Sequence, residues 1–127
     1  MVVACPAANP TTAFYERNGF TPITAAVVGG NIVFTDTASS ATALSVPLSS
    51  LSSTNDYFLL ETFNDGSHTV VLMYGINAPG TLASGVYFDK VFGSLSTLTS
   101  SAYIIHWQGT TPNVPVPTDT YTIVYQA

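Results

Sequence analysis

Short runs of β-branched and aromatic residues, separated by Gly, Pro, Asn and Asp at intervals of about 8–12 positions, dominate this chain. No segment keeps the 3.6-residue period of an amphipathic helix for about ten residues or more. This pattern predicts an all-β fold, a single antiparallel β-sandwich of the jelly-roll or immunoglobulin-like kind. With 127 residues, 46% of them hydrophobic, the chain can bury a sufficient core without disulfides.

The runs predict seven or eight strands and two hairpins with specific turn chemistry. Asp65-Gly66 predicts a type I′ turn, and Gly29-Gly30 supplies positive φ for a second hairpin. Pro47 places its strand at a sheet edge. Residues 93–101 are expected to form a loop or a single helical turn. The expected strands are 22–28, 31–36, 43–48, 57–63, 68–74, 85–92, 102–108 and 118–126.

The first 18 residues differ from the rest of the chain. They contain Pro6 and Pro10 and show no period of either two or 3.6 residues. We therefore expect an extended N-terminal arm over residues 1–18, which can act as a donor strand, and a β-sandwich domain over residues 19–127.

Cys5 is the only cysteine, so an intrachain disulfide is excluded. The preceding residues resemble a lipoprotein cleavage box, but the charged start and apolar run that should precede such a box are absent. A free thiol is the expected state, and an intermolecular disulfide made by the arm is the alternative.

No catalytic or cofactor motif stands out. His68 and His106 lie on different predicted strands, without the spacing of a zinc pair, and no Gly-x-Ser-x-Gly elbow occurs. Glu16 and Glu61 could join the aspartates as paired carboxylates, although turns and strand ends account for the aspartates. A calcium loop at Asn64 and Asp65 would lack the usual 12-residue pattern. We expect no enzyme activity, no cofactor and no metal.

Charge is nearly absent, since only 7% of residues are charged and the net charge is −5. Two basic residues, Arg17 and Lys90, cannot neutralise nucleic acid or an anionic membrane, and no apolar stretch is long enough to cross a bilayer. A surface with few charges avoids the desolvation cost of contacts with other copies. We therefore expect a self-assembling structural subunit of a filament, appendage or coat, with Cys5, Phe14 and Tyr15 in the inter-subunit contacts.

A carbohydrate- or receptor-binding module, such as a lectin-like domain or the head of a viral fibre, is the alternative interpretation. An exposed Trp107 would stack on a sugar, while Gln108 and Asn113 would bond its hydroxyl groups. Its partner would be a surface glycan. Burial of Trp107 in the sandwich core or in a subunit contact is the competing expectation.

The final run, Pro117-Thr118-Asp119-Thr120-Tyr121-Thr122-Ile123-Val124-Tyr125, is similar to the last strand of many extracellular β-sandwich domains and of pilus subunits. A short arm with a cysteine ahead of a sandwich also resembles the subunits of bacterial spore appendages. The paired cysteines of pilus subunits and the adjacent cysteines of spore appendages are missing here. These resemblances assign no role to any residue. We expect an extracellular, cell-surface or virion-surface location.

Overall fold

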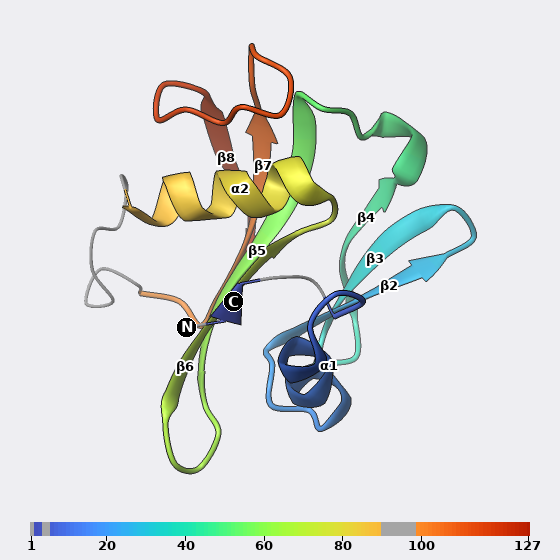
Figure 1. Ribbon diagram of the computed structural model, residues 1–127. Helices are drawn as coiled ribbons and strands as arrows, with labels where there is room; N and C mark the ends of the chain where they lie inside the picture. The colour runs from blue at the N-terminus through green and yellow to red at the C-terminus, as the bar shows by residue number, and fades with distance from the viewer. Residues whose placement is uncertain (1, 4–5, 90–98) are drawn as a thin grey trace.

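The computed structural model describes residues 2–3, 6–89 and 99–127, and the strands among them form two sheets (Figure 1). One sheet has the order β1-β6-β5-β7-β8 and the other the order β2-β3-β4. All neighbouring strands are antiparallel except β1, which is parallel to β6. The strands are β1 (Val2–Val3), β2 (Ile23–Val28), β3 (Asn31–Asp36), β4 (Thr42–Pro47), β5 (Asn55–Asn64), β6 (Thr69–Gly75), β7 (Ala102–Gln108) and β8 (Thr120–Gln126). Seven expected strands are confirmed to within about two residues.

The two sheets pack face to face around one apolar core. The three-stranded sheet contributes Ile23, Ile32, Phe34 and Val46, and the five-stranded sheet contributes residues such as Leu59, Leu72 and Ile104. The fold is therefore mostly β, with two packed sheets, and is compatible with the predicted β-sandwich. Pro47 ends β4 at an open edge of the smaller sheet, as predicted.

A helix forms a third layer that the sequence pattern did not predict. Helix α2 (Ala78–Tyr87) crosses the other face of the five-stranded sheet, where Ala83 and Tyr87 join a second core with Phe58, Ile105 and Trp107 (Figure 1). The central strands β5, β6 and β7 are consequently buried on both faces. Burial on both faces explains why β6 is a continuous apolar run rather than an alternating one.

The expected strand over residues 85–92 is wrong in its described part, because residues 85–87 are the last turn of α2. The buried positions Gly80, Ala83, Ser84 and Tyr87 recur at intervals of three and four, which is a helical period. Small residues at three of these four positions hid the period from a search for apolar residues. Residues 90–92 lie outside the described residues.

The N-terminus of α2 is held by a carboxylate from β5. Asp56, fully buried, accepts hydrogen bonds at Oδ2 from the backbone N–H groups of Asn77 (3.0 Å) and Gly80 (2.9 Å). Burial raises the pKa of the Asp56 carboxyl to about 6, although these hydrogen bonds lower it. A Cβ atom at Gly80 would lie 2.6 Å from Asp56 Oδ2, so only glycine allows this approach.

The expected extended arm is also wrong in part, because helix α1 (Pro10–Arg17) occupies most of its second half. Asn9 caps this helix, with its side chain accepting a hydrogen bond from Thr11 N (2.9 Å). Pro10 is the first helical residue, where the absence of an N–H group costs no intrahelical bond. Proline at this position starts the helix that we expected it to prevent.

Two predicted hairpins are confirmed, but only one turn has the expected chemistry. Gly29 and Gly30 have φ of +57° and +81°, as the tight β2–β3 turn requires. In the β5–β6 turn, Gly66 alone has positive φ, so the predicted type I′ turn is wrong. Asp65 instead accepts bonds at Oδ1 from the N–H groups of Ser67 and His68, which stabilises a longer loop.

The last strand also differs from its expected pattern. The sequence placed Tyr121, Ile123 and Tyr125 on one face, but the β7–β8 register shifts between Ile104 and Ile105. Tyr121 packs against the core beneath α2, whereas Tyr125 packs against the core between the sheets. A bulge of this kind moves later side chains to the opposite face.

Candidate assembly site

Strand β1 lies along the outer edge of the five-stranded sheet. Val2 pairs with Leu72 and Val3 with Met73, both in parallel register. Strand β6 would otherwise be the edge of a sheet whose central strands are buried, and its backbone N–H and C=O groups there would lack a strand partner. The N-terminal segment therefore completes the sheet.

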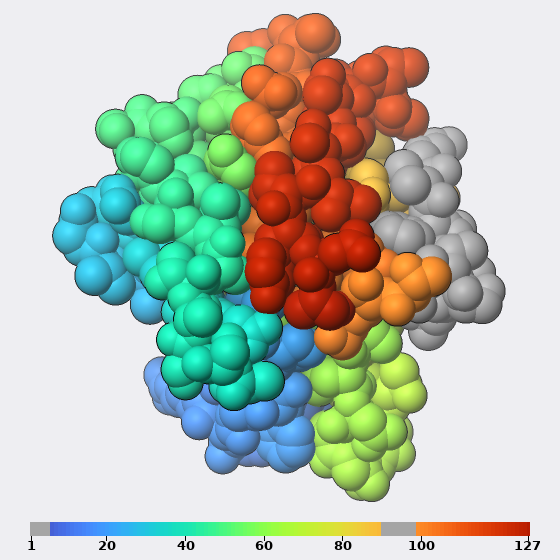
Figure 2. Space-filling view, turned by 180° about the vertical axis from the view of Figure 1, so that it is seen from behind, coloured from blue at the N-terminus to red at the C-terminus, as the bar shows by residue number. Residues whose placement is uncertain are grey.

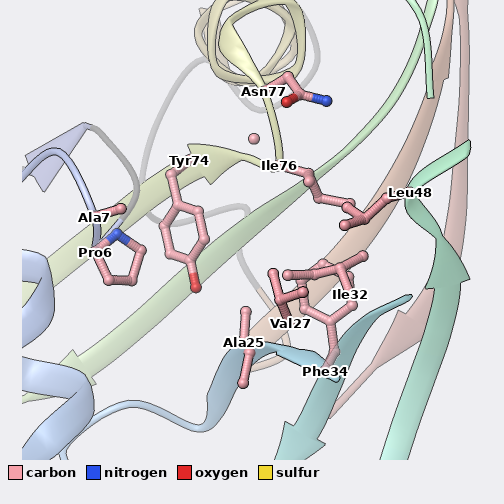
Figure 3. Close-up of a pocket in the computed structure, with 12 residues that line it drawn as sticks. Pro6, Ala7, Ala25, Val27, Ile32, Phe34, Leu48, Tyr74, Ile76 and Asn77 are labelled. Atoms are coloured by element: carbon pink, nitrogen blue, oxygen red, sulfur yellow. The ribbon is translucent and has the colours of Figure 1, made fainter. Parts of the chain in front are cut away.

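An apolar groove lies between the N-terminal segment and both sheets. It encloses about 360 Å³ and is lined by Pro6 and Ala7, by Ala25 and Val27 of β2, and by Tyr74 of β6 (Figure 3). Tyr74 projects from β6 toward the smaller sheet. None of the described residues that line this groove is charged, so its walls favour contact with apolar chain segments.

A second hollow continues the groove toward α2. The two share Gly75, Ile76 and Asn77, and the second extends to Ala8 and Leu82. Leu82 is 56% exposed and Val27 is 65% exposed, so apolar side chains project beside both hollows. Exposed apolar side chains gathered in one region do not stabilise a monomer, whereas contact with a partner would bury them.

Helix α1 is fixed to the domain by Tyr15. The Tyr15 ring packs edge-on against Phe63 with ring centroids 5.1 Å apart, and its hydroxyl donates to Asp65 Oδ2 (2.9 Å). Phe14, the preceding residue, is 53% exposed; its ring contacts Tyr15 edge-on (centroids 5.5 Å apart) and stacks on Phe20 (6.3 Å). Of the two aromatic residues expected in subunit contacts, Tyr15 contacts its own chain and Phe14 faces outward.

Two glutamates, Glu16 and Glu61, lie close together beneath α1, and we call them the carboxyl pair. Tyr74 donates its hydroxyl proton to Glu16 Oε1, and the Ala25 backbone N–H also donates to this carboxyl. Glu61, fully buried in β5, accepts a 2.7 Å bond at Oε1 from Ile23 N. The Oε2 atom of Glu61 is buried without a hydrogen-bond partner.

The carboxyl pair occupies the place of a missing strand at the β2 edge. Thr37 N donates to Pro22 O, and from this bond the ladder alternates, so Ile23 and Ala25 point their N–H groups away from β3. Glu61 and Glu16 accept these two groups. The pair therefore joins α1, β2 and β5 through hydrogen bonds that an adjacent strand would normally provide.

Burial raises the pKa values of both carboxyls. The pKa of Glu16 rises to about 7 because burial disfavours its charge more than the bonds from Tyr74 and Ala25 favour it. The pKa of Glu61 lies well above its ordinary range, first through burial and further through repulsion by Glu16. Near neutral pH the pair therefore holds at least one proton.

Few features of the sequence indicate that these two glutamates lie together. The interpretation of the aspartates as turn residues holds for Asp65 and Asp36, which bond turn N–H groups, but not for Asp56, which lies within β5 and caps α2. Glu61 follows Leu59 and Leu60 within a predicted strand, and a carboxylate inside an apolar run is the signal that could have found it.

The expected sugar-binding residues do not form an exposed aromatic site. Trp107 is fully buried beneath α2, where its Nε1 donates to Asp119 Oδ2 (3.0 Å). Its ring has no free face for a sugar, so the competing expectation of a core residue is confirmed. Gln108 and Asn113 are exposed. Cys5 lies outside the described residues.

The histidines serve separate local contacts. His68 lies in the β5–β6 loop near Asp65 (3.8 Å), whereas His106 bonds Asn55 Oδ1 (2.6 Å) and stacks on Tyr57. Burial lowers the pKa of His106. Within the described ranges, no three His, Cys, Asp or Glu side chains cluster as a metal site. The helices in these ranges are too short or too polar to span a membrane.

Charge is scarce on the surface as well as in the sequence. Among the charged side chains of the described residues, only those of Arg17 and Asp89 are exposed. The open edge strands β2, β4 and β8 carry no charged residue. Strand β8 lies open on the surface (red in Figure 2), with Ile123 and Val124 exposed. Charged side chains are a usual protection against edge pairing, and these strands lack them.

Comparison of the chain with protein-family models, curated proteins and solved structures finds no match.

Proposed function

We propose that this chain is a structural subunit that assembles with copies of itself by exchanging its N-terminal strand. In the isolated chain, Val2–Val3 pairs with β6 of the same molecule. In an assembly, the same two residues would pair with β6 of a neighbour, so every copy keeps its sheet complete. The parallel β1–β6 pairing is the observation that carries this proposal.

The surroundings of β1 support exchange. The apolar groove has no charged residue among its described lining residues, and its wall includes Pro6 and Ala7 of the same N-terminal segment. A neighbour's segment would meet the same apolar walls, because exchange replaces each intrachain contact by its equivalent between chains. Exchange of an existing segment changes the free energy little, because the contacts are equivalent, and it requires no second binding surface.

The nearly uncharged surface supports a crowded assembly. Neighbouring copies would desolvate few charges, since Arg17 and Asp89 are the exposed charged residues in the described part of the chain. Phe14 on α1 adds an apolar contact that travels with the exchanged segment. The product would be a filament, appendage or coat at an extracellular, cell or virion surface.

The size of the purified protein with and without the N-terminal strand tests the proposal. The full chain and a chain lacking residues 1–8 are compared by light scattering and negative-stain electron microscopy, with and without reducing agent. We expect assemblies only from the full chain. Assemblies that dissolve in reducing agent would assign the contact to Cys5 instead of the strand, and a full chain that stays monomeric would refute the proposal.

Two substitutions at one position give a matched control. Val3→Pro removes a backbone N–H group and disfavours strand pairing, whereas Val3→Ala keeps the backbone donor. We expect Val3→Ala to assemble and Val3→Pro to remain monomeric, with unchanged far-UV circular dichroism for both. Equal assembly of the two variants would show that strand exchange is not the mechanism.

The alternative function, a glycan-binding module, has less support. The residue expected to stack on a sugar, Trp107, is in the core, and the two hollows beside residues 6–8 have mostly apolar walls. Sugars need several polar partners for their hydroxyl groups. Self-assembly is therefore the function that the geometry supports best.

A further inference from the structure

The attachment of the N-terminal segment depends on helix α1. This helix follows β1 in the chain, and its contacts with the domain include those of Tyr15 and Glu16. Glu16 is the more central of the two, because its carboxyl is bonded to β6 through Tyr74 and to β2 through Ala25. Loss of these bonds would loosen α1 and, with it, the segment that carries β1.

Resting on the proposed function, we infer that the protonation state of the Glu16–Glu61 pair controls whether the N-terminal segment stays on its own chain. With both carboxyls protonated, α1 stays docked and β1 remains on its own β6. When Glu16 loses its proton, a negative charge lies partly buried beside Glu61, and the docked state becomes less favourable. Rising pH therefore increases the released population, through which segments can exchange between chains.

The groups around the pair offer little compensation for this charge. Strand β2, which supplies both N–H donors, contains no titratable residue. Strand β6 supplies the Tyr74 hydroxyl, and β5 supplies Glu61 itself. Asp36 at the end of β3 is bonded to Tyr125 and Ser39. Arg17, on α1, is exposed, and no ion pair joins it to the pair in the described residues.

The expected pH response follows from the two protonation equilibria of Glu16. In the docked helix its pKa is about 7, and in a released helix it returns to the ordinary value of 4.5. Linkage then raises the equilibrium constant for release about tenfold between pH 6 and pH 8, and the increase levels off above that range. Because the pKa of Glu16 is higher in the docked helix than in the released one, release becomes more favourable as pH rises through about 7.

Trypsin provides a direct readout of release. The chain has two tryptic sites, Arg17 and Lys90, and Arg17 is the last residue of α1. Arg17 must leave the helical conformation before trypsin can cleave after it, so the cleavage rate reports opening of the α1 end when reclosing is fast. The rate is measured on dilute full-length protein from pH 6 to pH 8.5 and divided by that of an added reference peptide.

We expect Arg17 cleavage to accelerate about tenfold from pH 6 to pH 8 in the natural chain. In Glu16→Gln this acceleration should be much smaller, because Glu61 is then the only member of the pair that titrates. Asp36→Asn is the matched control, because its turn carboxyl has a lowered pKa, and it should keep the natural slope. The inference would be overturned if the cleavage rate of the natural chain did not change with pH, or if the rate in Glu16→Gln changed with pH as much as in the natural chain.

A second variant covers the case in which Glu16→Gln does not fold. Tyr74→Phe removes the hydroxyl that favours the charged Glu16, so its cleavage rate should level off at a higher pH than that of the natural chain. An unmoved profile would contradict the inference. Light scattering on the same samples separates the two proposals. If the segment is released but no assembly forms at any pH, strand exchange alone is refuted. If assembly is the same at every pH and in both variants, the pH control alone is refuted.

Discussion

Substituting Gly80 by alanine tests how tightly α2 is joined to β5. The new Cβ would lie 2.6 Å from Asp56 Oδ2 and 2.9 Å from the Tyr57 carbonyl oxygen. Relief of this contact requires the buried Asp56 carboxylate to move, which weakens its bonds to Asn77 N and Gly80 N. The backbone on the other side cannot shift without separating the helix from the sheet.

The magnitude combines three effects. Overpacking costs about 1–3 kcal/mol, and weakening a buried bond to a charged group costs about 1.5–3 kcal/mol. Replacing a helical glycine by alanine returns about 1 kcal/mol. We therefore expect Gly80→Ala to lower the free energy of unfolding by about 3 kcal/mol in urea denaturation followed by circular dichroism.

Gly85 in the same helix is the matched control. A Cβ there would meet nothing within 4 Å, so Gly85→Ala should gain the helix-propensity benefit and stabilise the fold by about 0.5–1 kcal/mol. The reasoning is refuted if the free energy of unfolding of Gly80→Ala lies within about 0.5 kcal/mol of that of the natural chain, or if both variants lose the same amount of stability.

Three further predictions concern the carboxyl pair, the second core and the α1 surface. The melting temperature should fall as pH rises through about 7, because the pKa of Glu16 is raised in the folded protein and its protonated form stabilises the fold at lower pH. In Glu16→Gln the melting temperature should depend less on pH. Trp107→Ala should lower the free energy of unfolding by about 3–5 kcal/mol in urea denaturation, since the fully buried ring leaves a cavity. Phe14→Ala should leave urea denaturation unchanged and raise the protein concentration at which light scattering detects assemblies, because this side chain is exposed.

Local signals predicted most of the strands. The Gly29-Gly30 turn required positive φ, and the apolar runs on both sides of Asp65-Gly66 could pair only as a hairpin. Because neighbouring segments of the chain form these hairpins, the sequence pattern was sufficient. The detailed Asp65 turn was not predictable in this way, since side-chain bonds to the backbone replaced the expected turn type.

Features that depend on distant contacts were not predictable. Helix α2 is capped by Asp56, 24 positions before Gly80, and its small buried residues resemble a turn region when read alone. The Glu16–Glu61 pair arises only when α1 and β5 meet at the edge of β2. The apolar run before Glu61 marks it as an unusual carboxylate, but only the folded structure shows that Glu16 is its partner.

The most direct test of strand exchange asks whose β6 receives a given β1. A photoreactive phenylalanine derivative replaces Val3, and ¹⁵N-labelled and unlabelled chains are mixed in equal amounts at a pH above 7 before illumination. Mass spectrometry then identifies the label on each half of every cross-link between residue 3 and the β6 peptide. Exchange predicts that about half of these cross-links in assembled material join one labelled and one unlabelled chain. Cross-links confined to chains of the same label would contradict the account.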